Sequence, residues 1–301
     1  MKFYTFVADR KARLGVEQDG QIVDLGLAYE KLIAAKGPPP GWAPTFPANL
    51  PSLIRAGDLA MVAAREALAF AARRPPMPTG EYLSYPLDEV GLLPPIPRPG
   101  KILCVDLVSH ANEASAWFNK LPSSVIGPGA PILIPPGADH VTGVFRLVAV
   151  IGRRMRRVSP AEATAGVFGL TILNDIFMTS GDLSQNQPFL AKNLDTFCPL
   201  GPCVTTSDGL PAPGGIAIRV FLNNELTASG LIENPTAILA AHVSRLSGYL
   251  TLEAGDLVST PATAPEGAVL PTVELKPGDL LRVEADGIGV LENMLVSDPA
   301  H

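Results

Sequence analysis

Short apolar stretches separated by polar turns recur along most of the chain, a pattern typical of strands. Residues 140–152, HVTGVFRLVAVIG, read as one strand that ends in a glycine turn. Because successive side chains of a strand point to opposite faces, Arg146 shares its face with Val144 and Val148. The alternation therefore predicts an arginine on an otherwise apolar face, where a charge needs a partner.

The first 25 residues alternate in the same way and predict a β-meander. Asp19 and Gly20 lie between two alternating runs, which is a strong hairpin signal. Two helices are expected next, near residues 27–36 and 59–73, with Asp58 placed to cap the second. The segment GPPPGWAPTFP between them cannot be helical because of its prolines.

The segment PPIPRPG at residues 94–100 predicts a stiff connector, and we place a domain boundary just before it. The expected fold class is α+β and mainly β, with a small α+β domain at 1–92 and a larger domain at 93–301. Ser159 and Glu162 form a capping box that begins a short helix, and a longer helix is expected from about 236 to 249. Strands bounded by glycine, proline or aspartate are expected at 101–108, 130–136, 145–152, 169–179, 216–223, 256–262 and 279–293.

Composition narrows the class of protein. The chain has 301 residues, 47% of them hydrophobic, and its 31 prolines and 28 glycines favour short strands and tight turns. A net charge of -6 gives no reason to expect a nucleic-acid partner. No apolar run approaches the ~18 residues of a membrane span, and the charged first residues are unlike a secretion signal, so we expect a cytoplasmic protein. The three cysteines suit neither a disulfide framework nor a zinc site, and we expect them to be reduced and buried.

Among the four histidines, His110 has the best candidate role in catalysis. Glu113 follows it by three residues, so the two side chains share a face if the segment turns helically. A carboxylate beside an imidazole fixes its tautomer and raises its basicity, as a general base requires. An HxxE pair alone is a weak signal, because any surface helix can contain one.

Three further charged residues lie in apolar surroundings. Asp175, in LTILNDIFMT, is costly there unless it is paired, hydrogen-bonded or metal-bound, and a structural position at a strand end is an equal alternative. Lys120 and Lys192 either extend their ammonium groups to solvent or recognise a carboxylate or an oxyanion.

Taken in order, the motifs resemble the fumarylacetoacetate hydrolase family over nearly the whole chain. MKFYTF, RLGV and GQIVDL are similar to the family's amino-terminal domain. Its catalytic domain is matched by RPGKILCV, SSVIGPGAPILIPPG, LVAVIGRRMRRVSPAEA, GLTILND, AKNLDTFCPLGP, LTLEAGDLVSTP and LKPGDLLRVEADGIGVLEN. The resemblance implies a mixed β-roll catalytic domain, a homodimer, and a Mg²⁺-like cation that polarises a keto acid or diketo acid.

By position, the resemblance implies that His110 and Glu113 are the catalytic pair and that Lys192 is the active-site lysine. It also implies that Asp175 is a metal ligand and that Thr260 contacts the substrate. Relatives hydrolyse C–C bonds, decarboxylate, or isomerise enols to ketones. Fold alone does not decide among these reactions.

The resemblance breaks at the strand described first. Relatives resemble EAELAVVIG there, with two glutamates that bind the cation, whereas this chain has Val144 and Arg146 at those positions. Thr179 stands where relatives place a substrate-binding arginine. We therefore hypothesise that Arg146 pairs with Asp175 and takes the place of the cation, so that no cofactor is bound. The alternative is an edge-strand arginine in a slipped register.

The favoured function is an enzyme of altered, metal-independent chemistry that acts on a keto- or enol-bearing acid or a polyketide-like carbonyl compound. Proton transfer, decarboxylation, cyclisation or C–C cleavage are the reactions that a guanidinium in place of a metal favours. His110 and Glu113 move protons in this hypothesis. The residues expected to bind substrate or stabilise its charge are Lys192, Arg146, Lys120, Thr179 and Thr260.

Two alternatives stay open. A conventional acylpyruvate or diketo-acid hydrolase or isomerase retains Mg²⁺ or Mn²⁺ through substitute ligands such as Asp139 or His140. A non-catalytic binding protein of the same fold is the other, although such a protein need not keep His110, Glu113 and Lys192 together.

Overall fold

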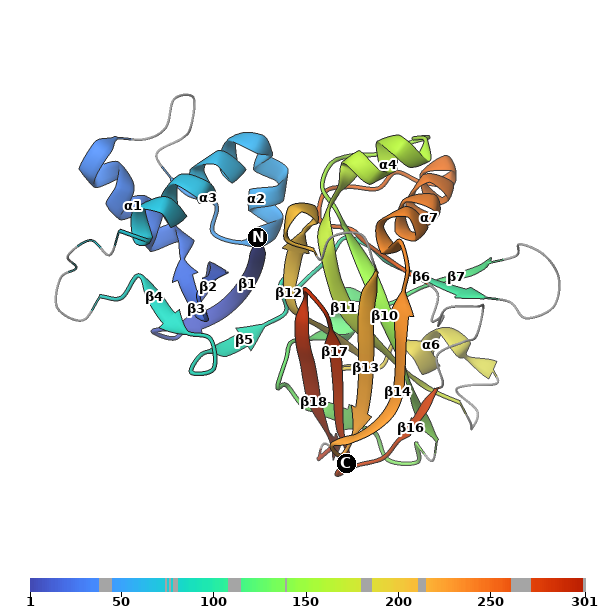
Figure 1. Cartoon of the computed structure of the whole chain (residues 1–301). Helices are drawn as coiled ribbons and strands as arrows, with labels where there is room; N and C mark the ends of the chain where they lie inside the picture. The colour runs from blue at the N-terminus through green and yellow to red at the C-terminus, as the bar shows by residue number, and fades with distance from the viewer. Residues whose placement is uncertain are drawn as a thin grey trace.

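The computed structural model describes residues 1–37, 45–73, 75, 77, 81–107, 115–138, 140–179, 186–210, 215–260 and 272–299, and Figure 1 shows their arrangement. Its helices are α1 (Leu25–Lys36), α2 (Leu50–Ala56), α3 (Asp58–Ala71), α4 (Pro160–Gly166), α6 (Pro188–Lys192) and α7 (Pro235–Tyr249). Its strands are β1 (Lys2–Ala8), β2 (Lys11–Gln18), β3 (Gln21–Asp24), β4 (Ser84–Pro86), β5 (Gly91–Leu93), β6 (Ile102–Leu107), β7 (Ser115–Asn119), β8 (Val125–Ile126), β9 (Ile132–Ile134), β10 (Val141–Ile151), β11 (Val167–Met178), β12 (Cys198–Thr206), β13 (Ile216–Leu222), β14 (Glu225–Ile232), β15 (Leu257–Ser259), β16 (Val273–Leu275), β17 (Leu280–Ala285) and β18 (Gly289–Ser297).

The first 24 residues form the predicted meander, β1 to β3. The β2–β3 turn consists of Asp19 and Gly20, both at positive φ, so the hairpin prediction is confirmed. Both predicted helices are present as α1 and α3. The predicted cap of α3 is wrong: Asp58 lies in the first turn, and Gly57, which has no side chain to accept a hydrogen bond, precedes it. The sequence pattern also missed α2.

Over the residues described, β1 lies inside one large sheet and links the amino-terminal strands to the later ones. It pairs with β2 on one side and with β12 on the other, giving the order β4-β3-β2-β1-β12-β11-β10-β15-β6-β7. The strand β5 also pairs with β1. The amino-terminal meander is therefore continuous with the strands that carry the candidate site, and the domain boundary at 92/93 stays a prediction.

A second sheet, of order β14-β13-β17-β18-β9, packs against one face of β10 and β11. Phe145, Leu147 and Ala149 belong to the apolar core between the sheets, whereas Val148 belongs to the core on the other face. The predicted alternation along residues 140–152 is thus confirmed, and the slipped register is wrong. The face of β10 that carries Arg146 looks toward β6, β7 and α6.

Two groups of helices pack against the large sheet. The helices α1 to α3 share a core with β1, β2 and β12, and α4 and α7 lie side by side near the end of β10 (Figure 1). The predicted capping box is confirmed at α4, where Ser159 and Glu162 bond reciprocally. The fold is α+β and mainly β, as predicted.

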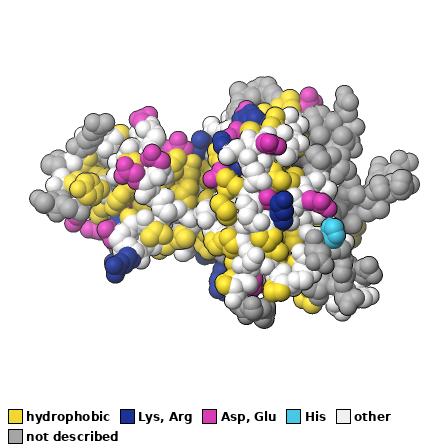
Figure 2. Space-filling view, turned by 90° about the horizontal axis from the view of Figure 1, so that it is seen from below, with side chains coloured by type: hydrophobic (Ala, Val, Ile, Leu, Met, Phe, Trp, Pro, Cys, Tyr) yellow, Lys and Arg dark blue, Asp and Glu magenta, His cyan; other side chains and the backbone are white. Residues whose placement is uncertain are grey.

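Two further predictions concern the surface and the thiols. On the face drawn in Figure 2, lysine and arginine side chains are scattered among acidic and apolar ones rather than gathered in one patch. No helix in the described part of the chain is long and apolar enough to span a membrane. Cys104, Cys198 and Cys203 are free and buried, as predicted.

Candidate active site

The register of β10 against β11 builds the candidate site. Val144 lies directly opposite Asp175, and Arg146 lies opposite Leu173. Residues opposite one another across an antiparallel pair share a face, as do residues two apart along a strand. Arg146 and Asp175 therefore project from the same face, two register positions apart.

The pairing of Arg146 with Asp175, which the sequence predicts, is present. Nε and Nη2 of Arg146 donate to Oδ2 of Asp175 at 3.1 and 2.9 Å. The Arg146 side chain is 1% exposed and the Asp175 side chain is 0% exposed. Burial raises the strength of such a pair but also the cost of leaving either member alone.

The rest of the Arg146 guanidinium is held by backbone. Its Nη1 donates to the carbonyl of Val105 at 2.6 Å and to that of Thr260 at 3.3 Å. Thr260 is fixed in turn, because its Oγ1 accepts from the Leu147 amide and its own amide donates to the Leu147 carbonyl. Thr260, predicted to contact substrate, thus supports Arg146 and β10 in this structure.

Lys120 is fully buried on the other side of Asp175. Its Nζ lies 3.0 Å from Oδ1 of Asp175 and donates to the carbonyl of Ile176 at 2.8 Å. It also donates to the carbonyl of Lys192. Three acceptors thus surround an ammonium group that has three N–H bonds.

Lys192 is the more accessible lysine of this cluster, with 22% of its side chain exposed. Its Nζ lies 3.6 Å from Oδ2 of Asp175 and 4.0 Å from the ring centroids of both Phe118 and Phe177. The Phe118 ring also lies 5.0 Å from Cζ of Arg146. Two aromatic faces and one carboxylate therefore fix the position of the ammonium group.

The charges of this cluster decide the protonation of Asp175. Burial by itself raises the pKa of Asp175, but the positive charges of Lys120, Arg146 and Lys192 outweigh it and hold the pKa below its ordinary value. Asp175 is therefore ionised at neutral pH. One carboxylate faces three cations, so the described cluster carries excess positive charge.

The described residues do not fit the divalent cation that the family resemblance implies. Such an ion needs several oxygen ligands, whereas the two positions nearest to Asp175 on β10 hold Val144 and Arg146. Both oxygens of Asp175 lie against protein cations. In the described ranges no group of three or more histidine, cysteine or acidic side chains is placed to hold a metal.

Other predicted residues lie away from this cluster or outside the description. Thr179 is exposed at the end of β11, where its amide and hydroxyl donate to the carbonyl of His140. His140 Nδ1 lies 3.5 Å from Oε1 of Glu274 on the surface. The predicted pair His110 and Glu113, and the substitute ligand Asp139, lie outside the described residues.

Sequence reasoning missed three residues of the cluster. Phe118 precedes Lys120 by two residues, and Phe177 follows Asp175 by two, so the strand period alone could have placed both rings on the site face. Asn193 gave no such signal. Its Nδ2 donates to the carbonyls of Asn119 and Phe189, and its Oδ1 accepts from the Leu121 amide.

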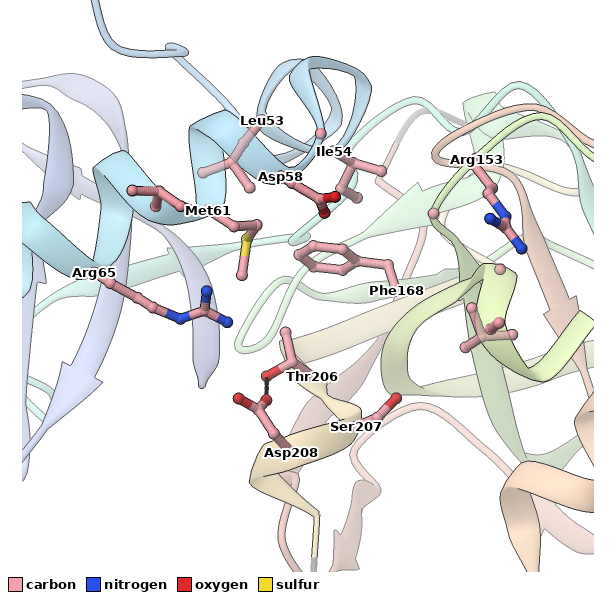
Figure 3. A pocket seen from close by; sticks show the side chains of 16 residues that line it. Leu53, Ile54, Asp58, Met61, Arg65, Arg153, Phe168, Thr206, Ser207 and Asp208 are labelled. Atoms are coloured by element: carbon pink, nitrogen blue, oxygen red, sulfur yellow. Dashed lines mark hydrogen bonds between the residues drawn. The ribbon is translucent and has the colours of Figure 1, made fainter. Parts of the chain in front are cut away.

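A separate cavity of about 710 Å³ lies between the helices α2 and α3 and the ends of β10 and β12. Figure 3 shows Phe168 and Met61 near its centre and Arg65 and Arg153 on opposite sides. It contains none of the site residues that the sequence predicts. Its lining carries as many acidic as basic side chains, so its charge indicates no class of ligand.

The fold and the cluster define a class of protein. Residues 105–296 match the family model described as fumarylacetoacetate (FAA) hydrolase C-terminal. The chain belongs to the fumarylacetoacetate hydrolase family.

Relatives of known name include oxaloacetate tautomerases. The chain is 32% identical over 315 aligned positions to oxaloacetate tautomerase YisK of Bacillus subtilis (strain 168), with 98% of this chain and 100% of the relative covered. It is 31% identical over 266 positions to a mitochondrial oxaloacetate tautomerase of Homo sapiens, which covers 84% of this chain and 81% of the relative.

Solved structures agree over the whole length. Maleylpyruvate hydrolase from Sphingobium sp. SYK-6, in complex with manganese(II) and pyruvate, is 25% identical with a TM-score of 0.71, over 99% of this chain and 100% of that one. Fumarylacetoacetate hydrolase from Exiguobacterium antarcticum is 26% identical with a TM-score of 0.73, over 99% of each chain.

Proposed function

We propose that the protein is an enzyme that interconverts the enol and keto forms of a small 2-oxo acid, with oxaloacetate as the first compound to test. The observation that carries this proposal is the buried cluster in which three cations surround Asp175. Three cations beside one carboxylate make the described cluster a positively charged site that suits an anionic ligand. A 2-oxo acid brings a carboxylate, and its enolate brings a second negative oxygen. The names of the tautomerase relatives support the same substrate class.

Lys192 is the residue that we assign to the developing enolate. Its ammonium group is partly exposed and firmly held, whereas Arg146 and Lys120 are buried. In the reaction a base removes the proton from the carbon next to the keto group, and the ketone oxygen gains negative charge. That oxygen then takes a proton, so one C–H bond breaks, one O–H bond forms, and nothing leaves. A fixed ammonium group stabilises the oxygen while it is charged.

His110 and Glu113 are the pair that we propose as the proton carriers, as the family resemblance implies. Glu113 would keep the imidazole of His110 in the tautomer that can accept a proton from carbon. Arg146 contributes through its charge, since its nitrogens donate to Asp175 and to backbone carbonyls. Thr260 keeps the guanidinium in place. The proposal also assigns Thr179, which is exposed at the outer end of β11, a contact with the substrate.

We propose further that this reaction needs no divalent cation. Arg146 places a positive charge beside Asp175, where the family resemblance implies a bound metal ion. A guanidinium polarises an oxygen less than a metal does, which suits proton transfer better than hydrolysis.

The test is the ultraviolet absorbance of enol-oxaloacetate, followed with purified protein. We expect faster conversion to the ketone than in buffer, with equal rates in EDTA and in added Mg²⁺ or Mn²⁺. Lys192→Met should lower kcat by about 10²-fold, and His110→Ala by ~10²–10⁴-fold. Lys101→Met is the control, because Lys101 pairs with Asp256 away from this cluster. Protein that gives only the buffer rate would refute the proposal.

Metal-dependent hydrolysis of an acylpyruvate is the second candidate, and the manganese and pyruvate complex of maleylpyruvate hydrolase favours it. Activity that EDTA abolishes and Mn²⁺ restores would decide for this candidate. A His110→Ala variant that changes no measurable property would instead indicate a non-catalytic binding protein. A homodimer and a cytoplasmic location stay predictions, and gel filtration tests the first.

A further inference from the structure

Lys120 gives the site a feature that the proposed function does not explain. It was predicted to bind substrate, yet its side chain is completely buried. An ammonium group has three N–H bonds, and three acceptors lie around it: Asp175 Oδ1 and the carbonyls of Ile176 and Lys192. The ammonium group is thus enclosed by protein groups, with hydrogen bonds to two carbonyls and an ion pair to Asp175.

The three acceptors come from two elements that pack against each other. Asp175 and Ile176 belong to β11, whereas Lys192 is the last residue of α6. The last carbonyls of a helix lack partners within the helix, and a cation there also suits the helix dipole. Lys120 therefore ties the end of α6 to the strand that carries Asp175.

Asn193 ties the same end of α6 to the segment that holds Lys120. Its carboxamide donates to the carbonyls of Asn119 and Phe189 and accepts from the amide of Leu121. Asn193, the residue after Lys192, is thus bonded to the residues on both sides of Lys120. Lys192 is fixed at its carbonyl by Lys120, at the next side chain by Asn193, and at Nζ by Asp175 and the two rings.

We propose that Lys120 and Asn193 are positioning residues, which act on the reaction by fixing Lys192 rather than by touching the substrate. This proposal rests on the proposed function only in its kinetic part. Freedom at the end of α6 would let the ammonium group leave the position where the enolate oxygen forms. Misplacement of a catalytic group by about 1 Å can cost roughly 10²-fold in rate.

The kinetic experiment compares Lys120→Met and Asn193→Ala with Lys101→Met, a control that also removes an ion-paired lysine. We expect both positioning variants to lower kcat about 10- to 100-fold with little change in KM. Because both variants loosen the same end of α6, their effects should be less than additive in the double variant. A higher KM at unchanged kcat in Lys120→Met, with Asn193→Ala silent, would mean that Lys120 binds substrate and would overturn the proposal.

A second measurement does not depend on turnover. Acetylation of Lys192 by a succinimidyl ester, followed by mass spectrometry, reports how freely its ammonium group moves. We expect at least about tenfold faster labelling in Lys120→Met and in Asn193→Ala, with labelling of Lys101 unchanged. Equal labelling of Lys192 in all variants would overturn the proposal even if the enzyme is active. Faster labelling in a protein without tautomerase activity would uphold the positioning and refute only the proposed function.

Discussion

Asp175 is the residue on which the candidate site depends. Two of its neighbours, Arg146 and Lys120, are buried with it, and each forms an ion pair with Asp175 and donates to backbone carbonyls. Removing the carboxylate would therefore take an ion-pair partner away from two buried cations. Breaking a buried pair in this way costs about 3–5 kcal/mol.

This cost leads to a prediction for Asp175→Asn. The variant should lose about 3–5 kcal/mol of unfolding free energy at pH 7, measured by urea denaturation. Because the pKa of Asp175 is lower in the folded than in the unfolded chain, its contribution is complete above the unfolded value of about 3.9 and is lost as the pH falls below it. The difference between wild type and variant should therefore shrink on acidification below pH ~4.

Asp195→Asn is the control for this prediction, because Asp195 is an exposed aspartate close to α6. We expect it to change the unfolding free energy by no more than about 0.5 kcal/mol. An Asp175→Asn protein as stable as the wild type would contradict the prediction.

The identity of Arg146 leads to a second prediction. Val144 lies opposite Asp175 and Arg146 lies two residues further along the same face. The double substitution Val144→Glu with Arg146→Glu would bring three carboxylates together, counting that of Asp175. Carboxylate oxygens are the ligands that hard cations prefer, and two lysines remain nearby. Calorimetry should show Mn²⁺ binding at least about tenfold tighter than in the wild type.

Arg146→Met is the matched variant, since it removes the guanidinium without adding a carboxylate. We expect it to gain no Mn²⁺ affinity. Wild-type protein that binds Mn²⁺ as tightly as the double variant would show that Arg146 does not stand in for the cation.

At the scale of elements, the strand period predicted the face of β10 because it is a local property. All eleven residues of β10 are buried, and alternate residues belong to different cores: Phe145, Leu147 and Ala149 to one, Val148 and Val150 to the other. The same period predicted that Arg146 and Asp175 both needed partners, and the family resemblance brought their strands together. The pair of Arg146 with Asp175 is therefore the part of the site that was predicted in most detail from the sequence.

Contacts between distant elements could not be predicted in the same way. Asn193 acts through backbone groups of Asn119 and Leu121, which have no signature in the sequence. The start of α3 shows a related limit, because Asp58 has a capping side chain but Gly57 occupies the cap position. The type of a residue indicates which hydrogen bonds its side chain can form, and the tertiary course of the backbone decides which of them form.

At the scale of the whole molecule, β1 connects the amino-terminal helices to the strands of the site. Phe3 on β1 is completely buried in a core that includes residues of α1 and α3 as well as of β10, β11 and β12. Its ring lies 5.6 Å from that of Phe168 on β11. The shared core implies that the two parts of the chain unfold together.

Phe3→Ala tests this coupling. Loss of the buried ring should lower the unfolding free energy by about 3–5 kcal/mol. Hydrogen exchange should then show that amide protection falls by similar factors in α1, α3 and β10, since all three depend on one core. Val7→Ala on the same strand is the control, because Val7 is 37% exposed and its loss should matter little. Protection that falls in α1 and α3 while β10 stays unchanged would mean that the two parts are independent, as the boundary at 92/93 alone would suggest.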